Sequence, residues 1–354
     1  MDDHVIETKT SLRKRKKLKA FRSKKEERQY WILLITFIVL GLLSSYGLLV
    51  YNNPVPVDSP SFIPVVKRRL VALTAMIIAV ICQTLATVAF QSVTNNRIIT
   101  PSLLGFEALY STIHTSTMFF FGTGVFLSFV GTGPFLIQVG LMVVLCLILY
   151  GWLLSGKYGN LQLMLLVGII IGTGLRSFAT FLRRLLEPSQ FDILHARLFG
   201  SVNNADPEYF PIAITLVLIA SVLLIANSKN LNVMALGKDI ATSLGVNHKY
   251  HVIYTLVLIS ILMSVSTALI GPLTFFGFLV ATLTYMLVPT YDHKYMFAMA
   301  LASGFVILTG AYFIMYHIFN AQGVVAVIIE IVGGVTFLVL ILRQFSRTVL
   351  NSMY

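Results

Sequence analysis

The stretch "TLVLIASVLLIANSKNLNVMALGKDIATSLGVNHKYHVIYTLVLISILM", residues 215–263, contains the pattern that decides the fold. Two apolar runs flank a connection that carries Lys, Asp, Asn and two glycines. A helix needs roughly 20 apolar residues to cross the hydrocarbon core of a bilayer. The two runs belong to apolar segments of about that length, 207–226 and 248–270. The stretch therefore predicts two membrane-spanning helices joined by a short amphipathic connection.

The composition of the whole chain agrees with this pattern. Of its 354 residues 57% are hydrophobic and only 11% are charged, and the mean hydropathy is +0.85. Soluble domains carry about 25% charged residues, so we predict an all-α polytopic membrane protein with about ten transmembrane helices. The weakest of the expected spans is 272–289, because it is short and starts at "GP", and a broken helix that enters the membrane is the alternative there. The expected spans are 30–51, 65–91, 101–121, 133–154, 160–182, 207–226, 248–270, 272–289, 294–317 and 323–343.

The positive charge is concentrated at the N-terminus. Residues 1–29 hold 11 of the 26 Lys and Arg residues, and an apolar run follows directly. A basic segment beside a span predicts a cytoplasmic tail attracted to anionic lipid, and we expect no nucleic-acid partner. The predicted organisation is a basic cytoplasmic tail (1–29), a transmembrane domain (30–345) and a short cytoplasmic C-terminus (346–354). The expected location is the cytoplasmic membrane, with both termini inside the cell.

Sequence motifs for chemistry are absent. There is no G-x-x-x-x-G-K-[ST] phosphate loop, no H-E-x-x-H and no C-x-x-C, and Cys82 and Cys146 lie apart in apolar runs. We therefore expect no catalytic residue, no cofactor, no metal site, and a transport subunit rather than an enzyme. Glu330 lies within the last span, where a carboxyl is costly and often functional. A protonated or hydroxyl-paired side chain at a helix contact is an equal alternative, and for Glu107 a place near a helix N-terminus or snorkelling is sufficient.

The connection 231–246 has the pattern of two short helices. Gly237 and Gly245 divide it, and Leu236, Ile240 and Leu244 recur every four residues. Gly245 is well placed to end a helix in the left-handed conformation. Such short helices are unstable alone. They need either the membrane interface or another protein to lie against, and periodicity does not decide between the two.

Small residues are frequent in two spans. Gly168 and Gly172 have GxxxG spacing in the fifth span, and Gly333 follows Glu330 by one turn. Such residues let helices pack closely, which is the default interpretation, but they also suit the lining of a passage. The segment 94–106 is polar and then has Pro101 at a helix start, and "GPLTFFGF" at 271–278 repeats a Pro followed by Gly-Phe. This hints at the internal repeat found in many transporters.

Four motifs together carry a family resemblance. "LNVMALGKDIATSLGVNHK" (231–249), "ALIGPLTFFGFLV" (268–280), "NNRIITPSLLGFE" (95–107) and "GGVTFLVLILR" (333–343) closely resemble segments of the membrane permeases of ATP-driven iron-siderophore and cobalamin importers. The subgroup that serves catecholate siderophores is the most similar. The resemblance implies the type II ABC importer architecture, in which two permease subunits, identical or different, pair above two cytosolic ATPases. It also implies a siderophore-binding protein outside the cell and a ferric siderophore as cargo.

The resemblance also implies roles for residues. The ATPase-coupling segment corresponds to Met234, Leu236, Gly237, Lys238, Asp239, Ile240, Leu244 and Gly245. Docking of the binding protein is expected at Arg68 and Arg69, although the spacing of "KRR" departs from the family pattern. Near the ninth span only His317 replaces a second family arginine, and Arg183 and Arg184 are expected, from charge, to compensate. The pathway and gate are expected at Asn95, Asn96, Pro101, Gly168, Gly172, Thr173, Glu330 and Gly333.

Two other classes remain open at this point. A secondary transporter driven by an ion gradient would depend on Glu330, but such proteins usually carry polar groups across several spans. A polytopic scaffold or membrane enzyme is the third class, and it lacks any catalytic cluster here.

Overall fold

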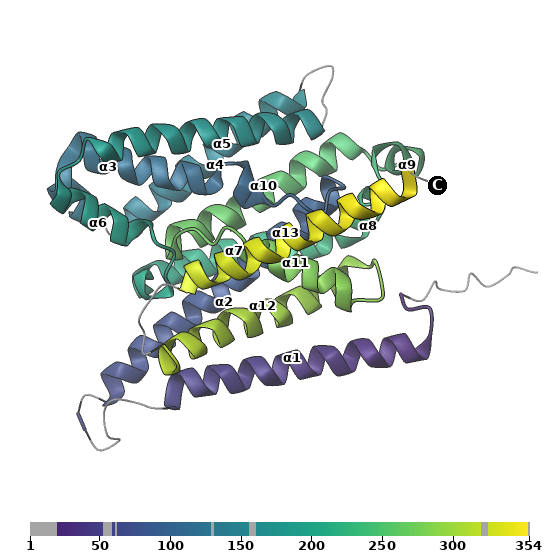
Figure 1. Cartoon of the computed structure of the whole chain (residues 1–354), viewed down its shortest axis with the longest axis horizontal. Helices are drawn as coiled ribbons and strands as arrows, with labels where there is room; N and C mark the ends of the chain where they lie inside the picture. Colours follow the sequence, from purple (N-terminus) through teal and green to yellow (C-terminus); the bar gives the residue numbers. More distant parts are fainter. Residues whose placement is uncertain are drawn as a thin grey trace, which may run out of the picture.

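The computed structural model describes residues 20–51, 59–60, 62–128, 131–155, 161–319 and 325–352. Within these ranges every regular element is helical, which confirms the all-α prediction (Figure 1). The long helices are α1 (Lys24–Val50), α2 (Phe62–Val93), α3 (Phe106–Ser128), α4 (Thr132–Ser155), α5 (Leu161–Arg184), α7 (Phe210–Ala226), α10 (His248–Ile270), α12 (His293–His317) and α13 (Val325–Ser352). The shorter elements are η1 (Pro101–Leu104), α6 (Pro188–Leu198), η2 (Val202–Asn204), η3 (Pro207–Tyr209), α8 (Ser228–Met234), α9 (Lys238–Ser243) and α11 (Phe276–Leu287).

Each of the ten predicted spans coincides with a helix. Among the described residues, six helices are long and apolar enough to cross a membrane: α1, α2, α5, α7, α10 and α12. Shorter apolar stretches lie in α4, α11 and α13. Helix α3 is interrupted at Gly122, whose backbone has φ 75° and ψ 177°. The helices therefore agree roughly with the ten predicted spans, but only six of them in the described residues have the length and composition of a full span.

Helices α2 and α10 form the centre of the bundle. They pack against each other, and α4, α7, α11 and α12 surround them, while α1 lies outside α12 (Figure 1). From Ala75 onward almost every residue of α2 is buried, including Gln83, whose Nε2 donates to Ser266 Oγ of α10 at 3.2 Å. Helices α3 and α5 pack together at one side of this centre. The core is thus a helix-on-helix structure that also buries polar side chains, and Gln83 and Ser266 bond to each other across two of its helices.

At 271–272 the structure has the break that the sequence left as an alternative. Gly271 has φ 85°, and helix α11 begins only at Phe276. The backbone of Gly200 lies against this break, because a Cβ on Gly200 would be 2.1 Å from the carbonyl oxygen of Pro272. The neighbouring Ser201 N–H donates to the carbonyl of Ile270 at 2.7 Å. A side chain at either glycine would separate the two segments, so this contact fixes where the broken helix begins.

The molecule has two distinct ends. The start of α1, the last turns of α13 and the short helices α8 and α9 gather at one end (Figure 1). The start of α2, the end of α12 and helix α6 lie at the opposite end (Figure 1). This arrangement places the amphipathic connection 231–246 at the same end as the first and last described helical turns.

Candidate functional site

The connection 231–246 folds as the sequence predicts. Gly237 separates α8 from α9 with φ 100°, and Gly245 follows α9 with φ 82°. The Gly245 N–H donates to the carbonyl of Thr242 and the Val246 N–H donates to the carbonyl of Ala241, each at 3.0 Å. This pair of bonds is the Schellman pattern that ends a helix at a left-handed glycine. The predicted helix-ending role of Gly245 is confirmed.

One face of this connection is apolar and exposed. The side chains of Leu236, Ile240 and Leu244 are 53%, 51% and 60% exposed. Ile240 lies within α9, Leu236 precedes it and Leu244 directly follows it. The opposite face is buried through Ala241 and Met234, both 0% exposed. Lys238 and Asp239 are exposed beside the stripe. Met234 therefore anchors the segment, while the other predicted coupling residues remain at the surface.

The segment is firmly connected to the helical core. Asn232 of α8 accepts a hydrogen bond from the His293 N–H at 2.9 Å and donates to Asp292 Oδ1 at 3.2 Å. The His293 ring is 1% exposed and bonds on its other side to Ser92 Oγ of α2 at 2.6 Å. A Cβ on Gly237 would lie 3.7 Å from Asn95 Nδ2, so the loop after α2 also borders the connection. These contacts connect α8 to α2 and α12, and the role of the segment in coupling stays a prediction.

Predicted docking residues meet at the opposite end. Arg68, Arg69 and His317 line a cavity of about 380 Å³ together with Asn203 and Tyr316. Arg69 donates to the carbonyl of Leu49 at 3.1 Å, and this contact satisfies the end of α1. Arg68 is exposed. The structure therefore brings His317 to the two arginines, and of the pair Arg68 has the more accessible side chain.

Arg183 and Arg184 end α5 and lie apart from this cavity. The Nη2 atom of Arg183 donates to Thr180 Oγ1 at 3.1 Å. The Arg183 side chain lines a different cavity, and Arg184 is exposed. The two pairs of arginines thus occupy separate positions. Their predicted role in docking stays a prediction.

A polar cavity of about 280 Å³ lies between α3, α5, α6, the break before α11, and α13. Thr274 Oγ1 is 2.7 Å from Glu107 Oε2 and 3.2 Å from Glu330 Oε1. Glu330 is hydroxyl-paired, as one sequence alternative expected. Glu107 is in the first turn of α3 but is only 7% exposed, so it does not snorkel.

Arg176, Arg183 and His195 also line this cavity. Sequence reasoning did not identify Thr274 or Arg176. The position of Arg176, a charged residue within a predicted membrane span and two turns before the end of α5, was the available signal for the arginine.

The remaining predicted pathway residues fall into two groups. Gly168 and Gly172 are buried against η1, because a Cβ on Gly172 would lie 3.2 Å from Gly105 Cα. Gly333 is similarly close to Phe275. Pro101 begins η1 and is buried, Asn96 Oδ1 accepts from the Ile98 N–H at 2.9 Å, and Asn95 is exposed with φ 49°. The glycines let neighbouring segments pack closely, and the role of all these positions as a gate stays a prediction.

Helix α5 presents a polar stripe at its outer surface. All its members are exposed in the single chain, and they recur at helical spacing: Thr173, Arg176, Ser177, Thr180 and Arg184. Such groups are not left facing lipid, since hydrocarbon cannot solvate them. This face of α5 therefore requires water or a second subunit beside it.

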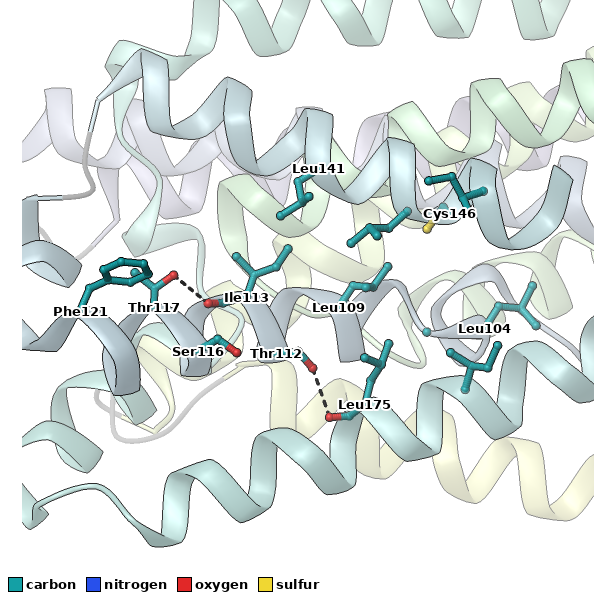
Figure 2. Close-up of a pocket in the computed structure, with 14 residues that line it drawn as sticks. Leu104, Leu109, Thr112, Ile113, Ser116, Thr117, Phe121, Leu141, Cys146 and Leu175 are labelled. Carbon is teal, nitrogen blue, oxygen red and sulfur yellow. Dashed lines mark hydrogen bonds between the residues drawn. The ribbon is translucent and has the colours of Figure 1, made fainter. Parts of the chain in front are cut away.

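A larger cavity of about 580 Å³ has the opposite character. Figure 2 shows Leu109, Leu141 and Leu175 projecting into it from α3, α4 and α5. The Thr112 hydroxyl on its wall contacts the carbonyls of Ala108 and Leu175, so the polar atom is occupied by the backbone. The lining suits hydrocarbon rather than a charged cargo. Among the described residues there is also no group of three His, Cys, Asp or Glu side chains suited to a metal ion.

Comparisons with known proteins agree with this architecture. The chain is 71% identical over 325 residues to the petrobactin import system permease protein FatC of Bacillus anthracis, covering 92% of each chain. It is 31% identical to the petrobactin import system permease protein YclO of Bacillus subtilis, covering 88% of this chain and 95% of the relative. A solved structure of a metal-chelate type ABC transporter in an inward-facing conformation shares the fold, with a TM-score of 0.75 at 18% identity. That match covers 88% of this chain and 99% of the solved one.

The model of the FecCD transport family matches residues 31–343. This match and the two relatives confirm the resemblance to importer permeases that the four sequence motifs carry. The chain is a multi-pass membrane permease subunit, not an enzyme, and it belongs to the FecCD transport family.

Proposed function

We propose that this chain is the permease subunit of an ATP-driven importer that moves a ferric siderophore, of the catecholate class, across the cytoplasmic membrane. The observation that carries the proposal is the exposed stripe of Leu236, Ile240 and Leu244 on a segment that is anchored to the core. Exposed apolar patches of this kind mark surfaces that bind a partner. A cytosolic ATPase is the partner that supplies energy to a chain without a phosphate-binding loop.

In this proposal the coupling segment acts through its hydrogen bonds to the helical core. Closure of the ATPase pair moves α8 and α9, and the bonds of Asn232 and His293 pass this movement to α2 and α12. The end that holds α8 and α9 then faces the cytoplasm, together with the start of α1 and the last turns of α13. The end that holds Arg68 faces the binding protein, and acidic side chains of that protein suit its exposed guanidinium.

Petrobactin is the cargo that the relatives favour. Two relatives, at 71% and 31% identity, carry petrobactin import in their names. A second Bacillus anthracis petrobactin permease, FatD, is only 25% identical to this chain. Two different permeases named for one system favour a heterodimer, and we propose that this chain pairs with a FatD-like subunit.

The test is uptake of iron-55 petrobactin by cells that lack the chromosomal copy and carry this chain on a plasmid. We expect uptake to be restored, to require the ATPase gene, and to be reduced by a competing catecholate but not by a hydroxamate chelate. Uptake that persists without the ATPase would instead support an ion-gradient-driven carrier. Competition by the hydroxamate alone would overturn the catecholate assignment.

The coupling surface has its own test. Leu236→Asp and Leu244→Asp place a charge on the apolar stripe and should abolish co-purification of the ATPase. Thr242→Asp is the matched control, because Thr242 is exposed on α9 and lies two positions from both Ile240 and Leu244, on the far side of the helix from the stripe. Normal ATPase recovery with both leucine variants would contradict the proposed surface.

A further inference from the structure

Two carboxyl groups share one hydroxyl in the polar cavity. Glu107 comes from α3, Glu330 from α13, and Thr274 from the break before α11. Glu107 and Glu330 each place an oxygen within 3.2 Å of Thr274 Oγ1. The three residues are far apart in the sequence, since 167 positions separate Glu107 from Thr274. The cluster therefore exists only when these three elements lie together.

If both carboxyls are ionised, this cluster has one donor hydrogen for two hydrogen bonds. A threonine hydroxyl has a single hydrogen to donate, whereas an ionised carboxylate only accepts. The Thr274 hydrogen can form one full hydrogen bond, so with both carboxyls ionised the second contact would bring a negative oxygen to the hydroxyl oxygen. One proton on either carboxyl supplies the second donor and satisfies both contacts.

The environment adds a second reason for a proton. Glu107 Oε1 is buried without a hydrogen-bond partner, although the Ser102 hydroxyl is a further neighbour of this carboxyl. Two negative charges near one another in a medium of low dielectric constant repel strongly, and such a pair ionises in separate steps.

The charged and titratable groups that face the cluster are limited in number. They are Arg176 and Arg183 of α5, His195 of α6 and Tyr110 of α3. The positive charges of the two arginines favour the ionised form of one carboxyl. In the part of the chain that the structure describes, neither arginine forms a salt bridge with Glu107 or Glu330, so neither supplies the second hydrogen that the cluster needs. The cavity of about 280 Å³ is large enough for water, so a proton can exchange with the medium.

From these contacts we infer that Glu107, Thr274 and Glu330 form a proton-binding site that holds one shared proton. The proton is donated by one carboxyl to Thr274 Oγ1, while Thr274 donates its own hydrogen to the other carboxyl. Separation of α3, α13 and the break before α11 removes the shared hydroxyl, and the proton then passes to water in the cavity. The site thus binds a proton in one arrangement of the helices and releases it in another.

The test is infrared spectroscopy of the full complex in lipid nanodiscs with carbon-13-labelled glutamate. A protonated carboxyl has a carbonyl band that is separate from that of carboxylates and shifts in D₂O. At neutral pH we expect one such band in the parent complex and its loss in the Glu107→Gln/Glu330→Gln variant. Glu208→Gln is the matched control, because exposed Glu208 also accepts a threonine hydrogen bond, from Thr132 at 3.1 Å, and this change should leave the band.

A conservative variant keeps the test valid if the double variant fails to assemble. Thr274→Val preserves the shape of the side chain and removes only the hydroxyl, so the band should move or disappear. A band that is absent in the parent complex, or unchanged in both variants, would overturn the shared proton. The measurement does not depend on cargo or on uptake, so its failure is distinguishable from failure of the proposed function.

Discussion

Gly333 and Gly334 are neighbours in α13, but only Gly333 packs against the break before α11. A Cβ on Gly333 would lie 2.5 Å from Phe275 Cβ, whereas one on Gly334 meets nothing within 4 Å. We expect Gly333→Ala to destabilise the subunit by about 1–3 kcal/mol through overpacking. Gly334→Ala should stabilise it by about 0.5–1 kcal/mol, because alanine loses less backbone entropy in a helix. Thermal unfolding in detergent compares the pair, and equal shifts would show that α13 does not pack there.

His293 is the residue through which the coupling segment contacts two core helices. Replacing it by alanine removes the contact with Ser92 Oγ and leaves Asn232 Oδ1 without its ring partner. Loss of buried hydrogen bonds costs about 1–3 kcal/mol when a partner remains unsatisfied. We expect His293→Ala to keep ATPase binding but to reduce the stimulation of ATP hydrolysis by cargo-loaded binding protein. Lys294→Ala, an exposed neighbour, should leave stimulation unchanged.

Variants of Arg68 and Lys67 show whether the binding protein contacts one specific arginine or is attracted by the general positive charge of the outer end. Both side chains are exposed, but only Arg68 lines the cavity with Arg69 and His317. We expect Arg68→Glu to weaken binding of the siderophore-binding protein at least tenfold, because it reverses a charge where an acidic partner is expected. Lys67→Glu should have a smaller effect. Surface plasmon resonance on the complex in nanodiscs measures both, and equal losses would point to long-range attraction alone.

At the scale of the element, the polar stripe of α5 makes a prediction about its surroundings. Ser177 lies in the stripe, whereas Phe178 is on its apolar edge and is 45% exposed. With Ser177→Cys we expect rapid labelling by a membrane-impermeant maleimide in the assembled complex, and with Phe178→Cys little labelling. The background is low because Cys82 and Cys146 are buried. Little labelling of Ser177→Cys would contradict an aqueous pathway beside the α5 stripe and would favour a second subunit that covers it.

Elements differ in how much of them the sequence predicts. Length and apolar composition locate all ten long apolar segments, because crossing a bilayer imposes a minimum length. Gly245 reveals the end of α9, because a left-handed helix end strongly favours glycine. The interruption of α3 at Gly122 was not predicted, since a glycine within an apolar run is equally compatible with a continuous membrane helix.

At the scale of the whole molecule, the sequence predicts the exposed coupling surface at one end better than the polar cluster inside the bundle. The coupling stripe is local, so periodicity alone places Leu236, Ile240 and Leu244 on one face. Thr274 gains its importance only from Glu107 and Glu330, which tertiary packing brings to it. His317 was noted as the sole replacement for a family arginine, and the fold brings it to Arg68 and Arg69. Local rules therefore predict surfaces, while shared polar sites require the packed structure.

The exposed apolar stripe of Leu236, Ile240 and Leu244 also affects the solubility and lifetime of the chain before it assembles with its ATPase. A subunit made without its ATPase displays three large aliphatic side chains to the aqueous phase, each more than half exposed. Surfaces of this kind promote self-association and recognition by quality-control proteases. Cells should therefore accumulate the permease only in step with its ATPase. Co-expression of the two genes would then raise the yield of monodisperse protein, and expression of the permease alone would yield aggregates or degradation products.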